Sequence, residues 1–336
     1  MIAGLALVMF AAVFQGVFLL TTARMKEWAW EHQWLGFSLF GMLIGNWVLG
    51  ALLLPHPLAI FAAVPREDLV IMAAFGLAWG AGAVLFGMGM DRLGLTLGYP
   101  LIMGLNASVG TLIPLVWLYG GSVFTGRRLA ILAGTAIAVA GIAACSVAGA
   151  RRNSSPENTQ SAPRSRFVSG LMIAIAAGVL SCFPNIGLTY GTGIVKAAQD
   201  QGASPGVAGN AILLLFFTFG GLVNVGYCAL LMVKNRRTRF LFAPRLAANW
   251  FWALLMGSLW ICSFYLYGIG TAWLGQGGST IGWPVYISLS IGIGVVCGLG
   301  KGEWKGAPSR ARTLLWEGLA LVAVAVLVIP LGSASR

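Results

Sequence analysis

Ten apolar runs, each long enough to cross a lipid bilayer, constrain the fold of this chain more than any other feature. A helix of about 20 apolar residues spans the hydrocarbon core, whereas an open strand cannot, because its backbone groups would stay unpaired in lipid. We therefore predict an all-α integral membrane protein with ten transmembrane helices. The predicted spans cover residues 3–22, 35–54, 68–90, 95–119, 128–149, 168–193, 207–233, 248–270, 279–300 and 311–332.

The apolar runs contain an internal repeat. Residues 94–100 read GLTLGYP and residues 278–284 read GSTIGWP, with Gly, Thr, Gly, an aromatic residue and Pro at the same spacing. One polar segment, residues 151–166, divides the spans into two sets of five. Because an odd number of crossings reverses the direction of entry, the two sets form an inverted repeat, which is typical of secondary transporters. We predict repeats at residues 1–150 and 167–336, joined by this linker.

The distribution of Lys and Arg predicts how the helices are oriented. Sixteen of the 21 basic residues fall in alternate connections that include the linker, and five fall in the other connections or at the C-terminus. Basic loops stay in the cytoplasm, so we expect a cytoplasmic linker and both termini outside, in a bacterial inner membrane. The chain carries a net charge of +12 but has only 9% charged residues. This combination indicates contact with anionic lipids and not with nucleic acid.

No motif of an enzyme or of a metal site occurs in the sequence. There is no phosphate-binding loop, no pair of carboxylates within a span and no Cys/His spacing that suits a metal. The five cysteines lie singly inside apolar runs, as small buried hydrophobic residues do. We therefore expect no enzymatic activity, cofactor or metal. A membrane sensor or scaffold is the alternative from another class, although no loop is large enough for a signalling domain.

Five amide side chains fall near the middle of predicted spans. A buried amide without a partner costs roughly 4–8 kcal/mol on an alkane scale, so each must face a neighbouring helix or a wet cavity. For Asn46 and Asn224 we favour a contact between helices. For Gln15, Asn106 and Asn185, which lie on helices expected at the repeat interface, we favour substrate binding, with helix contacts as the alternative.

Aromatic residues at the same depth form a second set of candidate substrate ligands. Trp79 and Trp260 are partners in the repeat and lie far from the interfaces that tryptophans usually occupy. We interpret them as a flat apolar wall for the C–H face of a sugar ring, beside amides that bind its hydroxyls. Packing in the core is the alternative. The residues that would extend this wall are Tyr99, Tyr265, Trp283 and Tyr286.

Several islands of sequence resemble the bacterial L-rhamnose–proton symporters, a family within the drug/metabolite transporter superfamily. They are KEWAWE at residues 26–31, FGLAWG at 75–80, GTL at 110–112 and KGEW at 301–304. The resemblance implies ten helices in two inverted five-helix repeats, and uptake of a 6-deoxy sugar with a proton by alternating access. The sequence departs from the family pattern at residues 81–85 and after Gly275, which leaves another sugar or small polar metabolite open as the substrate.

Proton coupling calls for an ionisable group within the membrane. None of the nine acidic residues falls at mid-depth. Asp91, at the inner end of the third span, and Glu317, about one turn into the last, come closest, and we predict both as coupling-ion residues. A surface pair of Asp91 with Arg92 or Arg24 is the alternative. The sequence thus predicts a proton-coupled sugar symporter, with an exporter or uniporter of another metabolite as the alternative.

Overall fold

The computed structural model describes residues 2–119, 126, 128–153, 164–243, 246–275, 278–302 and 304–328. Over these residues the chain is helical, and no strand occurs in the described ranges. The predicted all-α class is therefore confirmed. Most of the predicted linker, residues 154–163, and the end of the last predicted span, residues 329–332, lie outside the described residues.

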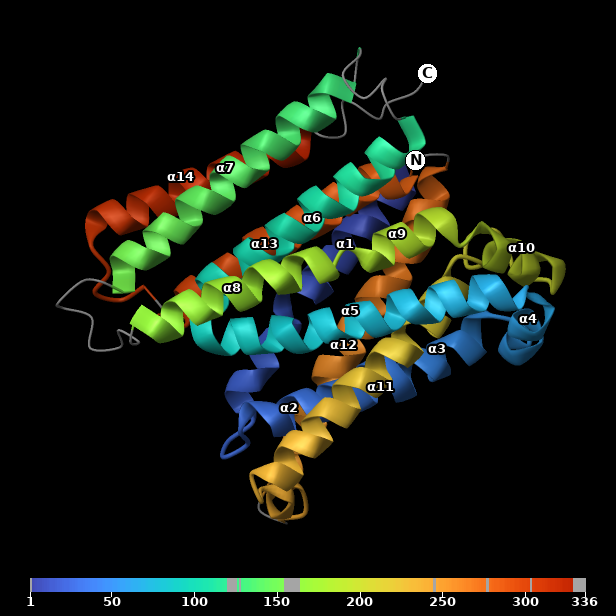
Figure 1. The fold of residues 1–336 in the computed structure, drawn as a ribbon, viewed down its shortest axis with the longest axis horizontal. Coiled ribbons are helices and arrows are strands. Elements are labelled where there is room, and N and C mark those ends of the chain that lie inside the picture. The colour runs from blue at the N-terminus through green and yellow to red at the C-terminus, as the bar shows by residue number, and fades with distance from the viewer. Residues whose placement is uncertain are drawn as a thin grey trace.

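Each predicted span coincides with one helix or with a short series of helices (Figure 1). In the first half these are α1 (Ile2–Val17) with η1 (Phe18–Arg24), α2 (Trp30–Phe37) with η2 (Ser38–Gly45) and α3 (Asn46–Leu53), α5 (Arg66–Leu93), α6 (Leu95–Tyr119) and α7 (Arg128–Asn153). In the second half they are α8 (Arg164–Leu180) with α9 (Phe183–Tyr190), α11 (Asn210–Lys234), α12 (Ala247–Leu274), α13 (Gly278–Gly300) and α14 (Ser309–Val328). The connections hold α4 (Pro57–Ala63), α10 (Thr192–Asp200) and η4 (Thr238–Leu241).

Seven of the helical stretches in the described residues are long and apolar enough to cross a membrane. The other three predicted spans correspond to α6, α13 and α14, and α13 contains a shorter apolar helix, Val285–Gly300. Large apolar side chains point outward from several helices, among them Leu52, Leu230 and Leu327. Outward-facing apolar side chains on long apolar helices are typical of a surface that contacts lipid, so the chain is a multi-pass membrane protein.

Two helix pairs, each with one helix from either half of the chain, form much of the bundle. Helix α1 packs on α12 and also contacts α13, and α8 packs on α5 and also contacts α6. Farther out, α11 packs on α5, and η2 packs on α12. The remaining helices α7 and α14 pack chiefly against each other at one side of the bundle (Figure 1). The middle of the bundle is thus formed by segments from both halves of the chain.

Glycines make two of the central crossings close. A Cβ atom on Gly41 of η2 would lie 3.0 Å from the Cα atom of Gly257 on α12. A Cβ atom on Gly80 of α5 would lie 2.8 Å from the Cα atom of Gly220 on α11. Backbones can approach this closely because neither partner carries a side chain. The π-helical turns of η2, a feature that recurs at functional sites, therefore lie directly against α12.

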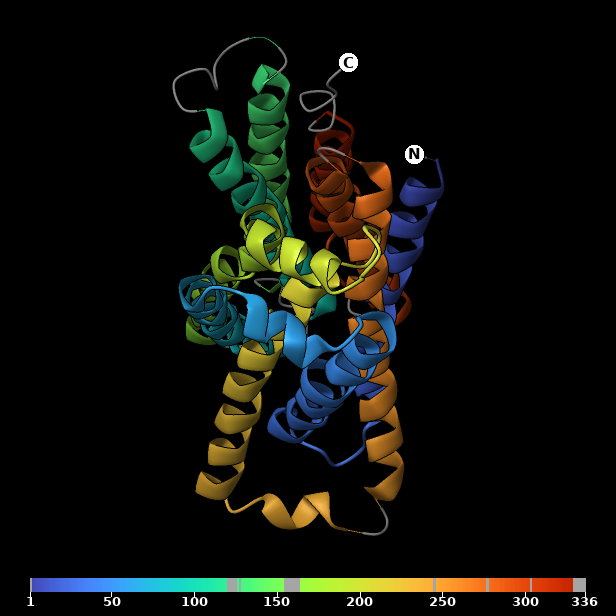
Figure 2. The ribbon, with the colours of Figure 1, turned by 90° about the vertical axis from the view of Figure 1, so that its right-hand side faces the viewer.

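The helix ends separate into two groups at opposite ends of the bundle (Figure 2). The beginning of α1 and the end of α14 lie at one end, whereas the connection through η4 between α11 and α12 lies at the other. An even number of membrane crossings places both ends of a chain on the same side of the membrane. The positions of the beginning of α1 and the end of α14 agree with an even number.

Candidate functional site

A small cavity lies in the middle of the bundle. It offers about 40 Å³ to the centres of water molecules, which is room for a few waters but not for a sugar. Aromatic and apolar side chains form most of its wall and a few polar groups enter it, as in pockets for small ligands. The lining residues are Gln15, Phe18, Trp34, Phe37, Met42, Trp79, Ala83, Phe86, Met103, Asn106, Ser181, Trp260 and Phe264.

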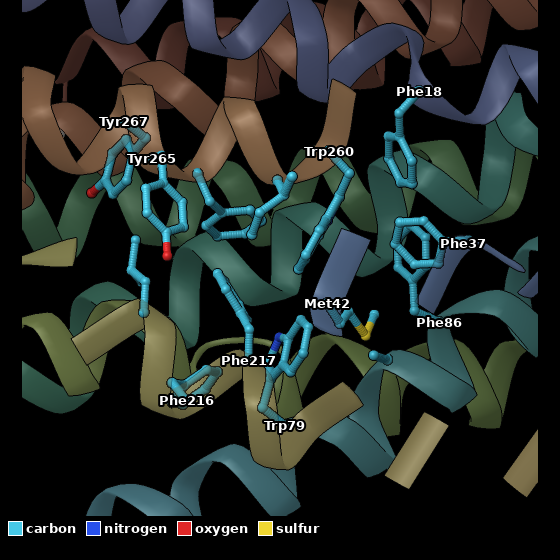
Figure 3. Close-up of a cluster of buried hydrophobic side chains, with 14 of the residues drawn as sticks. Phe18, Phe37, Met42, Trp79, Phe86, Phe216, Phe217, Trp260, Tyr265 and Tyr267 are labelled. Atoms are coloured by element: carbon cyan, nitrogen blue, oxygen red, sulfur yellow. The ribbon is translucent and has the colours of Figure 1, made fainter. Parts of the chain in front are cut away.

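Trp79 of α5 and Trp260 of α12 lie side by side in the wall of this cavity (Figure 3). Their rings are stacked, with centroids 5.7 Å apart. Phe217 of α11 packs beside both, with its centroid 5.0 Å from that of Trp79 and 4.8 Å from that of Trp260. The fold therefore brings together the two tryptophans that the sequence repeat pairs. The two indoles contact each other and both contribute to the lining of the cavity.

Gln15 of α1 is held in the cavity by hydroxyl groups from three other helices. Its Oε1 atom accepts hydrogen bonds from Ser263 Oγ and Tyr286 OH, both at 3.1 Å. These two hydroxyls are themselves 2.5 Å apart. Tyr99 OH donates to the backbone oxygen of Gln15 at 3.0 Å. Of these four residues the sequence identified all but Ser263, because a serine in an apolar span is a weak signal when it can bond to its own backbone.

Asn106 of α6 enters the same cavity with its carbonyl oxygen unpaired. The residue is buried, its Nδ2 atom lies 3.7 Å from Met103 Sδ, and no described residue hydrogen-bonds its Oδ1 atom. A buried polar atom without a partner costs about 1–3 kcal/mol. Ser181, between α8 and α9, also lines the cavity. Asn106 lines the cavity, and its orphaned acceptor is suited to a ligand hydroxyl or to water.

Asn185 and Trp283 place two more unpaired polar atoms next to Gly110 of α6. Asn185 Nδ2 donates to the Gly110 oxygen at 3.3 Å, and a Cβ atom on Gly110 would lie 3.3 Å from Trp283 Nε1. Within the described residues, neither Asn185 Oδ1 nor Trp283 Nε1 has a hydrogen-bond partner. Both side chains are buried outside the cavity lining. Gly110 lies one helical turn after Asn106, so these groups adjoin the site.

The remaining predicted wall residue, Tyr265, lies elsewhere. Its OH group donates to Asn46 Oδ1 at 2.9 Å, and Asn46 Nδ2 donates to the Leu214 oxygen at 2.9 Å. Asn224 on α11 has a similar role, because its Nδ2 atom donates to the Gly80 oxygen at 2.9 Å. Asn46 and Asn224 thus connect helices, as we expected for them, and Tyr265 takes part in one of these contacts.

A second hollow opens toward the α1–α2 connection, on the far side of Trp34. It holds about 410 Å³ of space that water can reach, and we refer to it as the vestibule. Its lining residues are Leu19, Thr22, Trp28, Ala29, Trp30, Gln33, Trp34, Gly87, Met90, Asp91, Gly94 and Lys301. Trp34 lines both hollows, and its Nε1 atom donates to Asn224 Oδ1 at 2.8 Å. Trp34 is therefore the partition between the cavity and the vestibule.

The two carboxylates predicted for ion coupling lie at the surface. The side chain of Asp91 is 53% exposed and forms an ion pair at 3.5 Å with Arg166, and not with Arg92 or Arg24. Glu317 is exposed on α14, in a surface groove that Arg151 and Arg310 also line. Exposed ion pairs contribute little stability. The central cavity brings together Gln15, Trp79, Asn106 and Trp260 but neither of these acids.

Comparisons with known proteins identify the family. The sequence profile described as L-rhamnose-proton symport protein (RhaT) matches residues 1–335. The chain belongs to this family. Relatives named L-rhamnose-proton symporter from Cronobacter sakazakii, Klebsiella pneumoniae and Citrobacter koseri are 28%, 27% and 27% identical to it, and each alignment covers 93% of this chain and 92% of the relative. A solved crystal structure of a protein with 15% identity, a TM-score of 0.54 and 98% coverage of both chains supports a likeness of fold alone.

Membership of the RhaT family fixes the class of function. The family is one of symporters and not of enzymes, so the predicted class, a transporter without enzymatic activity, is confirmed. The islands KEWAWE and FGLAWG, which carry the resemblance, now have positions in the structure. The second island supplies Trp79 to the cavity, and the first supplies Trp28 and Trp30 to the vestibule.

Proposed function

We propose that this RhaT-family protein takes up L-rhamnose, or a closely related deoxy sugar, together with a proton, and that the central cavity is the sugar site. The observation that carries this proposal is the meeting, in one cavity, of a tryptophan pair and an amide oxygen without a partner. Trp79 and Trp260 offer apolar faces to the C–H side and the methyl group of the sugar. Asn106 and Gln15 offer hydrogen bonds to its hydroxyls, and such a combination is typical of small-ligand pockets.

Asn185 and Trp283 extend the site when it expands around a sugar. Their unpaired Oδ1 and Nε1 atoms are an acceptor and a donor beside Gly110. Tyr99 and Tyr286 do not contact the sugar in this proposal. They support the site indirectly, because their hydroxyls hold Gln15 in place. Tyr265 supports the site through its bonds to Asn46.

The chain is organised, in this proposal, as two inverted five-helix repeats of the drug/metabolite transporter type, at residues 1–150 and 167–336. The helix contacts are consistent with this symmetry, because most have a counterpart five spans later in the chain. The packing of α1 on α12 and α13 has its equivalent in α8 on α5 and α6, and that of α11 on α5 in η2 on α12. The pairs α6–α7 and α13–α14 correspond in the same way.

We place the protein in the bacterial inner membrane with both termini outside and the linker 151–166 in the cytoplasm. The support is the excess of Lys and Arg in the connections at the linker's end of the bundle. The vestibule then opens toward the cytoplasm. Anionic lipid headgroups are the expected partners of these basic connections.

Transport by alternating access follows from the partition between the two hollows. The cavity is too small for a sugar while Trp79 and Trp260 are stacked, and Trp34 closes it from the vestibule. Release to the cytoplasm requires the Trp34 indole to leave Asn224 and the two tryptophans to part. The two repeats would rock about the cavity to produce this change.

Asp91 and Glu317 stay candidates for the coupling site, with unequal support. Asp91 lines the vestibule that the sugar would pass through, and its contact with Arg166 can break at little cost because both groups are exposed. Glu317 lies on α14, which packs mainly on α7, away from the cavity.

The proposal is tested by ligand-dependent thermal stability and by uptake. A ligand that binds the folded state at 100 times its Kd adds about 2.7 kcal/mol of stability. We expect L-rhamnose to raise the unfolding temperature of the purified protein, and proteoliposomes to take up the sugar faster when the lumen is alkaline. Stabilisation by a different metabolite, with none by L-rhamnose, would overturn the substrate assignment. Uptake that ignores pH and an uncoupler would indicate a uniporter, and a protein that moves no solute would return a sensor or scaffold to consideration.

A further inference from the structure

Several buried polar atoms without a partner lie outside the cavity lining and form one group. They are Asn185 Oδ1, Tyr267 OH, Trp283 Nε1 and both amide atoms of Asn210, and none has a hydrogen-bond partner among the described residues. All four side chains are at most 5% exposed. An unpaired polar atom in a protein interior is costly and calls for a specific explanation. Their concentration in one region indicates that this region does more than pack the bundle.

These four side chains, which we call the polar cluster, are connected through Tyr267 of α12. The ring centroid of Tyr267 lies 5.3 Å from that of Trp283 on α13. The next residue of α12, Gly268, packs on Asn210, because a Cβ atom on Gly268 would collide with Asn210 Oδ1. Trp283 and Asn185 adjoin the same turn of α6. The polar cluster therefore reaches from the edge of the cavity to the beginning of α11.

The polar cluster lies on the side of the cavity away from the vestibule. Figure 3 shows Tyr267 and Phe37 on opposite sides of the stacked tryptophans. Phe37 packs on Trp34, with ring centroids 4.7 Å apart, and Trp34 borders the vestibule. Asn210 begins α11, whereas the other end of α11 leads to η4, and Trp28 of the vestibule donates to an oxygen of η4 at 3.3 Å. In the predicted orientation the vestibule faces the cytoplasm and the polar cluster faces the outside.

The sequence repeat relates the polar cluster to the vestibule. An ungapped alignment of residues 76–93 with residues 257–274 pairs the two tryptophans of the cavity. The same alignment pairs Phe86–Gly87 with Tyr267–Gly268. Gly87 lines the vestibule, whereas Gly268 is buried beside the polar cluster. Equivalent positions of the two repeats are thus open at one end of the bundle and closed at the other.

The helices that precede these segments make equivalent contacts as well. Trp30 begins α2, and a Cβ atom on Gly87 would lie 2.7 Å from Trp30 Nε1. Asn210 begins α11, which is the equivalent span of the second half, and it packs on Gly268 in the same way. Both Trp30 and Gly87 line the open vestibule. Alternating access moves one repeat against the other around the central site. When the two repeats exchange conformations, Asn210 and Gly268 become exposed as Trp30 and Gly87 are exposed here.

We propose that Asn185, Asn210, Tyr267 and Trp283 form an outer sugar-binding subsite, which L-rhamnose occupies before it reaches the tryptophan pair. This inference rests on the proposed function. The asparagine oxygens accept hydrogen bonds, whereas the phenol and the indole N–H donate them, and sugar hydroxyls can do both. The two aromatic rings supply apolar surface for the C–H groups of the sugar. Because the unpaired atoms have no partners while the outer side is closed, its opening costs them no hydrogen bond and lets each gain one.

The subsite is tested with Tyr267→Phe, which removes one hydroxyl and keeps the ring. This hydroxyl has no partner among the described residues, so we expect the unfolding temperature without sugar to stay the same or rise. In proteoliposomes, the KM for L-rhamnose uptake should rise about fivefold, with the maximal rate within about twofold of the wild type, because a hydrogen bond to the entering sugar is lost.

Tyr265→Phe is the matched control for stability. Tyr265 lies two residues before Tyr267 on α12 and is also buried, but its hydroxyl donates to Asn46 Oδ1 at 2.9 Å and lies 3.0 Å from the Asn46 backbone oxygen. Removal of this hydroxyl leaves buried acceptors without their donor, so it should lower the unfolding temperature. The two variants therefore separate an unused hydroxyl from one that holds helices together.

Access from the outside is tested with Asn210→Cys in intact cells and a charged thiol reagent that does not cross the membrane. We expect the reagent to modify this cysteine, and mass spectrometry assigns the modified residue, so the native cysteines can stay. Ala211→Cys is the matched control, because Ala211 is as fully buried as Asn210 and points about 100° away around the helix. This control should stay unmodified.

The proposal is overturned if Tyr267→Phe keeps the wild-type KM, or if it lowers the unfolding temperature as much as Tyr265→Phe does. It is also overturned if the reagent does not reach Asn210→Cys from the outside, or modifies Ala211→Cys equally. A wild-type protein that takes up no L-rhamnose refutes the proposed function instead. The labelling result is independent of that outcome, because it needs no sugar.

Discussion

Replacement of Asn106 by leucine should change stability and sugar binding in opposite directions. The Asn106 amide is buried, its oxygen has no partner among the described residues, and its nitrogen meets only a methionine sulfur at 3.7 Å. The folded protein without sugar therefore bears an uncompensated desolvation cost of about 1–3 kcal/mol. Leucine has a similar volume and needs no partner, so we expect Asn106→Leu to gain about 1–2 kcal/mol of unfolding free energy.

The same substitution removes an acceptor that we assign to a sugar hydroxyl. A hydroxyl that is buried against leucine without a partner costs about 1–3 kcal/mol, which corresponds to a roughly 5- to 150-fold weaker affinity for L-rhamnose. Buried cysteines offer a convenient assay, because Cys145, Cys182 and Cys228 are free and buried. A thiol-reactive dye then reports unfolding during a thermal ramp, with and without the sugar.

Asn224→Leu is the matched control, because it changes the same residue type at a buried position where the amide is fully used. Asn224 accepts from Trp34 Nε1 at 2.8 Å and donates to the backbone oxygens of Gly80 and Gly220 at 2.9 and 2.8 Å. Three hydrogen bonds between or within membrane helices are worth about 2 kcal/mol in total, and the Trp34 donor would be left unpaired. We expect clear destabilisation here. If Asn106→Leu is destabilised as much as Asn224→Leu, or binds L-rhamnose as the wild type does, the assignment of Asn106 as a sugar ligand is wrong.

Two further predictions concern the walls and the crossings of the bundle. Trp79→Ala and Trp260→Ala should each abolish L-rhamnose uptake while the protein still reaches the membrane in normal amounts, and normal uptake by both variants would remove the tryptophan pair from the mechanism. Gly257→Ala should lower the unfolding free energy by about 1–3 kcal/mol, because its Cβ atom would lie 2.5 Å from the backbone nitrogen of Gly41. Gly226→Ala on α11, where a Cβ atom meets nothing within 4 Å, should be neutral or slightly stabilising in the same thermal assay, and equal losses in the two variants would refute the packing argument.

Much of the fold follows from hydropathy alone. Each apolar run is helical over its described residues, because a run of that length in lipid has no other way to pair its backbone groups. The sequence repeat also pairs Trp79 with Trp260, and the two rings are stacked in the structure. Residue type and depth in the membrane did not predict which neighbour each buried polar side chain contacts. Tyr265 and Tyr286 share a chemistry and a burial, yet one supports Asn46 and the other holds Gln15.

The difference arises from the rotation of each helix about its axis, which depends on neighbours distant in the chain. Glu31 shows the limit most clearly. As an acid in a short basic connection it gave no signal of burial, yet it is 5% exposed, and its partner Arg237 lies 206 positions away.

The sequence by itself determined that this chain forms membrane helices, that it carries a repeat, and that polar and aromatic groups lie at mid-depth. These are properties of composition and spacing, which act locally. Only the tertiary structure decided which amides found partners, which remained unpaired beside the cavity, and which carboxylate was buried. Those outcomes depend on the close crossings of η2 with α12 and of α5 with α11, where contacts between distant segments set the side-chain environment.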